Sequence, residues 1–320
     1  MKKLIALFLC LCLMAGIVPV VAESAAEATK AETTAAETAA AETPKAEMTA
    51  KELYRTGEDA FYAEDYGKAM EYYLLAAEAG NAEGWRSAGY LYDFGLGVEQ
   101  SSATALEYYQ RAADQGDAKA WFNIAYLYFE GDGVEQDYGK AVEYYLKAAD
   151  LGDSAALFNL GVMYHFAEGV KQDYGKAFEY YQKAADLGDA AALNNLGVLY
   201  EEGLGVEKDY DKALEYYQKA ADLGEAYGYE GLGRLYLDGK AVEQDYAKAV
   251  EYFTLAVEEN VPDAMIDLGD LCYEGKGLEK DLGKAAEWYR KGLDAGYEPE
   301  EEEQARLKEV LGDEYTQKQE

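Results

Sequence analysis

The feature that most constrains the fold of this chain is an internal repeat with a period of 36 residues. Two adjacent aromatic positions recur at this spacing, without insertion or deletion, from residue 72 to residue 289. A period of this length is typical of a solenoid, in which each repeat buries its apolar surface only against its neighbours. The two columns are Tyr72, Tyr108, Tyr144, Tyr180, Tyr216, Tyr252 and Trp288, and Tyr73, Tyr109, Tyr145, Tyr181, Tyr217, Phe253 and Tyr289.

Each repeat has the pattern of two amphipathic helices. In one unit, Leu157, Leu160 and Tyr164 fall on one face of the first helix. Asp173 is placed to cap the second helix, and Gly188 follows its end, where a positive φ costs glycine little. Neither helix can bury its apolar face alone, so the hairpins must stack. We therefore predict an all-α fold, a right-handed α/α superhelix (solenoid) of stacked helical hairpins.

The repeat also carries residues that resemble a known family. The first-helix pattern Trp-x-x-Leu-Gly-x-x-Tyr is the tetratricopeptide signature; residues 193–200 match it with Leu at the first position, and residues 85–92 match it with Ala in place of Leu. The period of 36 residues and the Gly-x-Gly-Val turn at 203–206 are similar to the Sel-one-like repeat (SLR) family, which is related to the tetratricopeptides. Residues 137–153, DYGKAVEYYLKAADLGD, also resemble this family closely. The resemblance implies a solenoid whose first helices line a concave groove.

The repeat sets the expected domain boundaries. Six SLR hairpins of 36 residues span 83–296, and residues 51–82 resemble an ordinary tetratricopeptide hairpin that lacks the long turn. Residues 297–320 are predicted to form an acidic C-terminal capping helix and tail, with Pro299 at the first helical position. Residues 23–50 are a spacer rich in Ala, Glu and Thr, with no apolar face to bury.

The first 22 residues have the pattern of a secretory signal peptide. Lys2 and Lys3 precede an apolar run, and small residues precede a predicted cleavage after Ala22. We expect a secreted or cell-envelope protein, without membrane insertion once the signal is cleaved. The alternative is an uncleaved signal anchor that tethers the chain to the membrane, since residues 4–22 could just span a bilayer. After cleavage Cys272 is the one remaining cysteine, which excludes an intramolecular disulfide.

Charge and composition exclude several functions. The chain has 29 Lys and Arg against 63 Asp and Glu, a net charge of −34, which repels nucleic acid and favours a basic partner. With His165 as the single histidine and no Ser/Lys or Ser/His motif, we expect no enzyme, no cofactor and no metal site. The position of His165 holds very different residues in other units, so we expect it on the surface at a helix end. Cys272 replaces a packing tyrosine and is expected to be buried.

Candidate binding residues lie on the face of each first helix that points away from the hairpin core. They differ between units, so packing does not dictate them. Asparagine amides there would bond the backbone of an extended peptide, and aromatic rings would hold its side chains. Alternatively, the amides are solvated or bond neighbouring helices, and the rings pack at the seams between units. The predicted groove residues are Arg86, Tyr90, Phe122, Asn123, Tyr126, Phe158, Asn159, Asn194, Asn195 and Arg234.

Three functional hypotheses follow. The leading one is an exported, non-enzymatic scaffold that binds a protein or peptide through its concave surface. The second is recognition or assembly of a cell-wall glycan or exopolysaccharide, with the aromatic residues stacked on sugar rings. The third is a β-lactamase-like hydrolase, because the cysteine-rich exported branch of the family has been linked to β-lactam hydrolysis. The paired cysteines of that branch are absent from this chain, which disfavours the third hypothesis.

Overall fold

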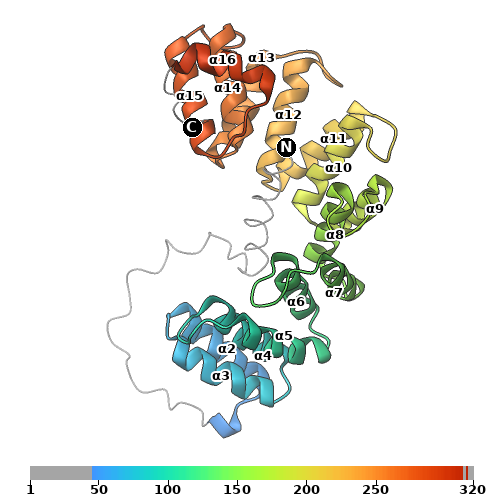
Figure 1. The fold of residues 1–320 in the computed structure, drawn as a ribbon, viewed down its shortest axis with the longest axis vertical. Helices are drawn as coiled ribbons and strands as arrows, with labels where there is room; N and C mark the ends of the chain where they lie inside the picture. The colour runs from blue at the N-terminus through green and yellow to red at the C-terminus, as the bar shows by residue number, and fades with distance from the viewer. Residues whose placement is uncertain (1–44, 313–314, 316–320) are drawn as a thin grey trace, which may run out of the picture. The chain divides into compact units, whose positions relative to one another are not determined.

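The computed structural model describes residues 45–312 and Tyr315, and all regular structure within them is helical (Figure 1). The predicted signal peptide and most of the predicted spacer lie outside the described residues. None of the helices in the described part of the chain combines the length and the hydropathy needed to cross a membrane. The bounds are η1 Lys45–Glu47, α2 Ala50–Tyr62, α3 Tyr66–Glu78, α4 Ala82–Phe94, α5 Ser102–Asp114, α6 Ala118–Glu130, α7 Tyr138–Asp150, α8 Ser154–Phe166, α9 Tyr174–Asp186, α10 Ala190–Glu202, α11 Tyr210–Asp222, α12 Ala226–Asp238, α13 Tyr246–Glu258, α14 Pro262–Glu274, α15 Leu282–Asp294 and α16 Glu301–Leu311.

Contacts divide the described chain into two compact units, an N-terminal unit of residues 45–156 and a C-terminal unit of residues 157–315. In the N-terminal unit α2 packs on α3, α4 on α5 and α6 on α7, and α3 and α5 also contact the hairpin that follows. In the C-terminal unit each helix from α9 to α15 packs on the next one in the same way, and α16 packs on α15. The predicted all-α fold of stacked hairpins is confirmed.

Every described hairpin except α6–α7, which has Ala125 at the equivalent position, is organised around a buried aromatic ring of its second helix that lies against a glycine of its first helix. In the N-terminal unit Tyr109 of α5 lies on Gly89 of α4, and a Cβ at Gly89 would be 2.8 Å from the ring. In the C-terminal unit a Cβ at Gly197 would be 2.6 Å from the ring of Tyr217. Side chains do not pack this closely, so glycine allows the ring to lie directly against the first helix. The same contact joins Gly57 to Tyr73, Gly161 to Tyr181, Gly233 to Phe253 and Gly269 to Tyr289.

The glycine-rich turn between the helices of a hairpin has a second role that the sequence analysis missed. Its first glycine ends the first helix in the left-handed conformation, as predicted, with φ of 66° at Gly95. Its second glycine packs against the preceding hairpin, and a Cβ at Gly97 would lie 2.6 Å from Cβ of Tyr66. A Cβ at Gly205 would similarly meet the backbone carbonyl carbon of Tyr174 at 2.5 Å. The turn is therefore a stacking contact as well as a helix stop.

The C-terminal helix begins later than predicted. Pro299 lies before the helix rather than at its first position, because α16 starts after Glu300. The backbone N–H of Glu300 donates to the carboxylate of Glu303 at 2.9 Å, and this capping contact fixes the start of the helix. The helix is acidic in its first turn, but it also has an apolar face that includes the buried Leu307.

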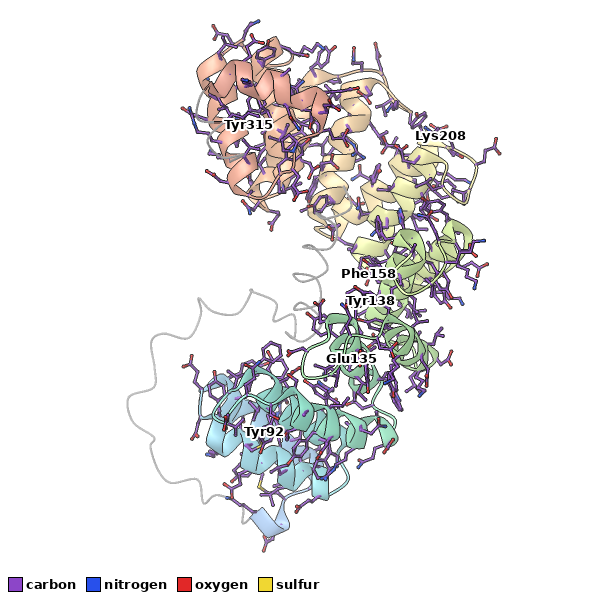
Figure 2. All side chains as sticks on the ribbon, in the orientation of Figure 1. Tyr92, Glu135, Tyr138, Phe158, Lys208 and Tyr315 are labelled. Carbon is purple, nitrogen blue, oxygen red and sulfur yellow. The ribbon has the colours of Figure 1, made fainter. Side chains whose placement is uncertain are left out.

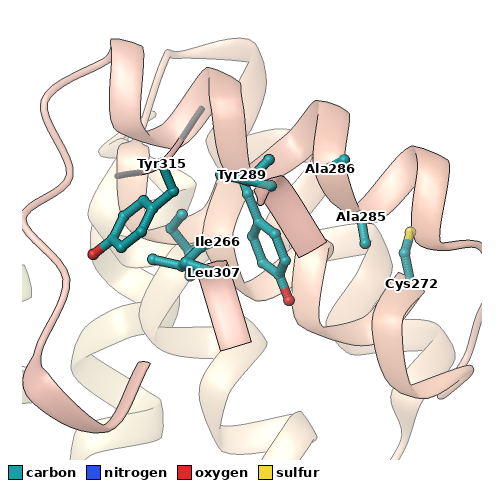
Figure 3. Packing of buried hydrophobic residues seen from close by; sticks show 8 residues of the cluster. Ile266, Cys272, Ala285, Ala286, Tyr289, Leu307 and Tyr315 are labelled. Carbon is teal, nitrogen blue, oxygen red and sulfur yellow. The ribbon is translucent and has the colours of Figure 1, made fainter. Parts of the chain in front are cut away.

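That apolar face covers the last hairpin of the C-terminal unit, as Figure 3 shows. Leu307 and Tyr315 pack in one cluster with Ile266 of α14 and Tyr289 of α15. Cys272, which was predicted to be buried, belongs to the same cluster and is 2% exposed. Burial raises the pKa of its thiol, which favours the inert protonated form. The helix therefore ends the repeat by covering apolar surface that a further hairpin would otherwise cover.

We expect Gly89→Ala to lower the free energy of unfolding by about 1–3 kcal/mol, because the new methyl group overpacks the buried ring of Tyr109. The matched control is Gly67→Ala near the start of α3, where the nearest atom to a new Cβ is 3.9 Å away. That variant should be neutral or up to about 1 kcal/mol more stable. Urea denaturation followed by far-UV circular dichroism measures both, and equal effects of the two substitutions would contradict the packing argument.

Candidate functional site

An aromatic pocket opens on the N-terminal unit between α2, α4 and α6. Its volume of about 90 Å³ is well below that of typical small-molecule sites and suits part of one side chain. We call it the aromatic pocket. It is lined by Tyr54, Glu58, Phe61, Tyr62, Tyr73, Arg86, Ser87, Tyr90 and Asn123.

Helical spacing brings these side chains together. Tyr54, Glu58 and Phe61 are four and three residues apart and share one face of α2. Ser87 and Tyr90 are three residues apart on α4. The hydroxyls of Tyr54 and Ser87 lie 3.2 Å apart, and the ring centroids of Phe61 and Tyr90 are 6.1 Å apart. The two helix faces therefore meet along the pocket.

Aromatic surface continues from the pocket to the solvent. Tyr62, which lines the pocket at the end of α2, is 59% exposed, and Phe94 at the end of α4 is 41% exposed. The ring of Phe94 lies 4.4 Å from that of Tyr90, centroid to centroid. The predicted residue Tyr90 thus joins the pocket to an exposed aromatic rim formed by Tyr62 and Phe94.

Arg86 is held in the pocket wall by its own carboxylate partners. Its Nε donates to Oδ2 of Asp117 at 2.9 Å, and Asp117 also caps α6 through its other oxygen. Glu83 lies 4.0 Å from the same guanidinium. The side chain of Arg86 is 15% exposed. The charge of Arg86 is therefore compensated within the unit, and the residue is a fixed part of the wall.

Glu58 has no hydrogen-bond or ion-pair partner among the described residues. Burial is the largest cause that raises the pKa of its carboxyl above the ordinary value, and the nearby Glu83 and Asp59 raise it further. Arg86 and Arg55 act in the opposite direction but do not reverse the shift. The pocket thus contains a carboxylate whose ionised form has no directly bound cation among the described residues.

The predicted aromatic strip is less exposed than expected. Phe122 is 6% exposed, and its ring lies 5.5 Å from that of Tyr145, so the exposure predicted for it is wrong. Tyr126 is half-buried. Phe158 on α8 is also half-buried, with its ring 5.8 Å from that of Tyr181 (Figure 2). The physical reason in the N-terminal unit is that α6 packs on both α5 and α7, which leaves little of its circumference free.

The predicted asparagine series does not present a row of free amides. Asn123 and Asn159 are 9% and 3% exposed, so their predicted exposure is wrong. The amide of Asn195 donates to the carbonyl oxygen of Ala191, one turn earlier in its own helix, at 3.0 Å. Asn194 is half-buried. Of the predicted polar residues, the structure brings Arg86 and Asn123 together with Tyr90 at the aromatic pocket.

Arg234, in the C-terminal unit, belongs to a buried charge network that the sequence analysis missed. Its guanidinium pairs with Glu201 at 2.9 Å and with Glu230 at 3.3 Å. The hydroxyl of Tyr217 donates to the same oxygen of Glu201 at 2.7 Å. Glu230 is 5% exposed, and burial raises its pKa to about 7. Arg234 is therefore engaged within its unit.

His165 is buried, and the prediction of a surface position is wrong. It is 7% exposed, its Nδ1 lies 3.5 Å from the hydroxyl of Tyr181, and burial lowers its pKa to about 4. The equivalent position in other units supplies a hydrogen-bond acceptor to a buried tyrosine. In the α4–α5 hairpin, for example, the hydroxyl of Tyr109 donates to the carboxylate of Asp93. The sequence signal was a polar residue 16 positions before each such tyrosine, seen at Asp93, His165 and Glu201.

A second set of aromatic residues stabilises the hairpins. Tyr92 of α4 stacks on Tyr108 of α5 with centroids 5.5 Å apart (Figure 2). In the C-terminal unit Tyr164 stacks on Tyr180 at 5.6 Å, and the ammonium of Lys176 lies 4.7 Å from the Tyr164 centroid. Tyr92 and Tyr164 occupy equivalent positions of two repeats, as do Tyr108 and Tyr180. The repeated tyrosines therefore include rings that contact one another and lysine side chains within the hairpin.

Comparison with known proteins defines the class of protein. The family model described as Sel1 repeat matches seven consecutive segments, 48–81, 86–117, 118–153, 154–189, 190–225, 226–261 and 262–297. The chain therefore belongs to the Sel1 repeat family, whose members are generally non-catalytic scaffolds that bind proteins. The first matched segment contains the α2–α3 hairpin, which lacks the long turn. A search of curated proteins gave no match to the sequence.

Two solved structures support the same assignment. A Sel1 repeat protein from Oxalobacter formigenes is 31% identical, with a TM-score of 0.70, over 76% of this chain and 99% of that one. The protein c5321, a protective antigen present in uropathogenic Escherichia coli strains that displays an SLR fold, is 32% identical with a TM-score of 0.69. That match covers 82% of this chain and 56% of c5321, so this chain spans little more than half of its length. The fold is an all-α helical-repeat superhelix.

We expect His165 to make stability depend on pH. Its pKa of about 4 in the folded state lies below the unfolded value of about 6.5, so as pH falls between these values only the unfolded chain gains the proton. This stabilising contribution is present above pH 6.5 and is lost as pH falls towards 4, by about 2–3 kcal/mol. Urea denaturation at pH 7 and at pH 4.5 measures it.

His165→Phe is the matched comparison, because Phe129 occupies the equivalent position one repeat earlier. The variant should lose less stability between the two pH values than the unmodified chain does. Carboxylates that titrate in the same range contribute to both proteins and cancel in the difference. An identical loss in the two proteins would show that His165 does not resist protonation.

Proposed function

We propose that this protein is an exported, non-catalytic scaffold that binds a segment of a partner protein through the first-helix face of its N-terminal unit. The single observation that carries the proposal is the aromatic pocket with its exposed rim. Large aromatic residues beside an arginine are the side chains that most often anchor protein interfaces. Tyr62 and Phe94 offer apolar contact area at the rim, and Tyr54 and Arg86 fix the shape of the wall.

The proposal narrows the binding surface expected from the sequence. Phe122, Asn123 and Asn159 are too buried to contribute much contact area without rearrangement. The accessible aromatic residues are instead concentrated at the ends of α2 and α4. A partner segment of several residues would cross this region and place one side chain in the aromatic pocket. The family's general use in protein binding supports the same kind of partner.

We propose export on the basis of residues 1–22, which have the composition of a signal peptide. Cleavage after Ala22 would release the scaffold outside the membrane or in the cell envelope. An uncleaved signal anchor would instead tether it, with the repeat region on the same outer side. In the tethered arrangement the spacer of residues 23–50 would separate the binding unit from the membrane surface.

Selection from a random peptide library displayed on phage tests the binding function. The immobilised full chain should enrich a set of related peptides. The double variant Tyr62→Ala/Phe94→Ala should reduce binding of those peptides at least tenfold, because it removes the exposed rim while leaving the buried rings in place.

The matched control is Leu151→Ala/Leu187→Ala, which removes two side chains of similar exposure, 52% and 55%, away from the pocket. It should bind the selected peptides as the unmodified chain does. Circular dichroism of all three proteins confirms that helicity is unchanged. Failure to enrich any peptide family, or equal loss in the control variant, would disprove binding at this face.

A further inference from the structure

We propose that the aromatic pocket accepts a positively charged side chain, lysine or arginine, from the bound segment. The inference rests on the proposed function, since it names the chemistry of the partner that the N-terminal unit would bind. Three features of the pocket carry it: its aromatic walls, an uncompensated carboxylate and its size.

The walls of the pocket are mostly aromatic. Tyr54, Phe61, Tyr62, Tyr73 and Tyr90 surround a space between three helices. The face of an aromatic ring carries partial negative charge, so a cation within about 6 Å of it is attracted. Several rings around one cavity add their contributions, which is how proteins recognise ammonium groups in a setting that is otherwise apolar.

Glu58 gives the pocket a formal negative charge. Its carboxylate lines the cavity and has no partner among the described residues. An ammonium or guanidinium group in the cavity would supply the missing counter-charge and would make charge-assisted hydrogen bonds to it. A neutral apolar side chain would fill the same space but would leave the carboxylate without a partner, which is costly in a partly buried site.

Arg86 does not cancel this preference, although it lines the same cavity. Its guanidinium is bound to Asp117 at 2.9 Å and has Glu83 at 4.0 Å. Around Glu58 and Arg86 four carboxylates, those of Glu58, Asp59, Glu83 and Asp117, therefore stand against two guanidinium groups, those of Arg86 and Arg55. The local balance is negative, as is that of the whole chain, which has a net charge of −34 and would attract a basic segment from a distance.

The size of the pocket limits the occupant to one side chain. A cavity of about 90 Å³ is smaller than the roughly 300 Å³ at which small-molecule sites begin. A long basic side chain can place its charged end in such a cavity while its methylene stem lies along the rings of the rim. The exposed Tyr62 lines the pocket and the exposed Phe94 contacts Tyr90 of its wall, so both would offer ring surface to that stem.

Three short peptides test the inference. Each is an N-acetylated and C-amidated pentapeptide, Gly-Gly-X-Gly-Gly, in which X is lysine, norleucine or glutamate. Norleucine keeps the apolar stem of lysine and lacks the ammonium group. Titration of the ¹⁵N-labelled full chain, followed by NMR, should show the lysine peptide shifting amide signals of α2 and α4. Its affinity should be at least tenfold higher than that of norleucine, and glutamate should bind more weakly than both.

Two variants of the protein separate the contributions of the carboxylate and the rings. Glu58→Gln keeps the shape of the side chain and removes its charge. It should therefore lower the affinity for the lysine peptide at least fivefold and leave the affinity for the norleucine peptide unchanged. Tyr90→Leu keeps an apolar wall and removes one ring, so it should also lower the affinity for the lysine peptide more than that for the norleucine peptide. The control is Glu107→Gln on α5, an exposed carboxylate that does not line the pocket and should change neither affinity.

The outcomes distinguish this inference from the proposed function. Equal affinity for the lysine and norleucine peptides, or full lysine binding by Glu58→Gln, would overturn the cation preference. If library selection still yielded rim-dependent peptides in that case, protein binding would stand while the inference failed. If the lysine peptide bound the pocket but selection enriched no peptide family, the pocket chemistry would stand and the proposed scaffold function would fail.

Discussion

The contact between a glycine of the first helix and an aromatic ring of the second determines the geometry of every described hairpin except α6–α7, which has Ala125 at that position. Because glycine has no Cβ, the ring of Tyr109 or Tyr217 lies directly against the opposite helix. The phenol hydroxyl then reaches the last turn of the first helix, where Asp93 or Glu201 accepts its hydrogen bond. One close approach therefore sets both the apolar packing of the hairpin and the buried polar pair at its end.

Stacking of the hairpins leaves little of the first helices free for binding. Within each unit α4, α6, α10, α12 and α14 each contact the second helix of their own hairpin and that of the hairpin before it. Phe122 is buried for this reason, whereas Tyr62 and Phe94 at helix ends remain exposed. The exposed aromatic surface of the N-terminal unit is therefore concentrated where helices α2 and α4 end, and Tyr62 of this surface also lines the aromatic pocket.

Charged side chains of the first helices also differ in whether a partner inside their own unit already binds them. The guanidinium of Arg86 is bound to Asp117, and that of Arg234 in the other unit is bound to Glu201 and Glu230. The positive charges predicted to meet a partner are thus compensated inside each unit. Glu58 has no hydrogen-bond or ion-pair partner among the described residues, and the nearby Arg86 and Arg55 do not reverse the upward shift of its pKa.

The sequence by itself determined the hairpin period and the helix starts and stops within the repeats, although not the start of α16, because these depend on residues close together in the chain. Asp173 caps α9 and Gly188 takes a positive φ, both as predicted. Only the tertiary structure decided which first-helix residues are exposed and that Tyr54 and Ser87, 33 positions apart, meet. It also showed that His165 is buried. The physical reason is that burial depends on how closely successive hairpins approach, and no local pattern encodes that distance.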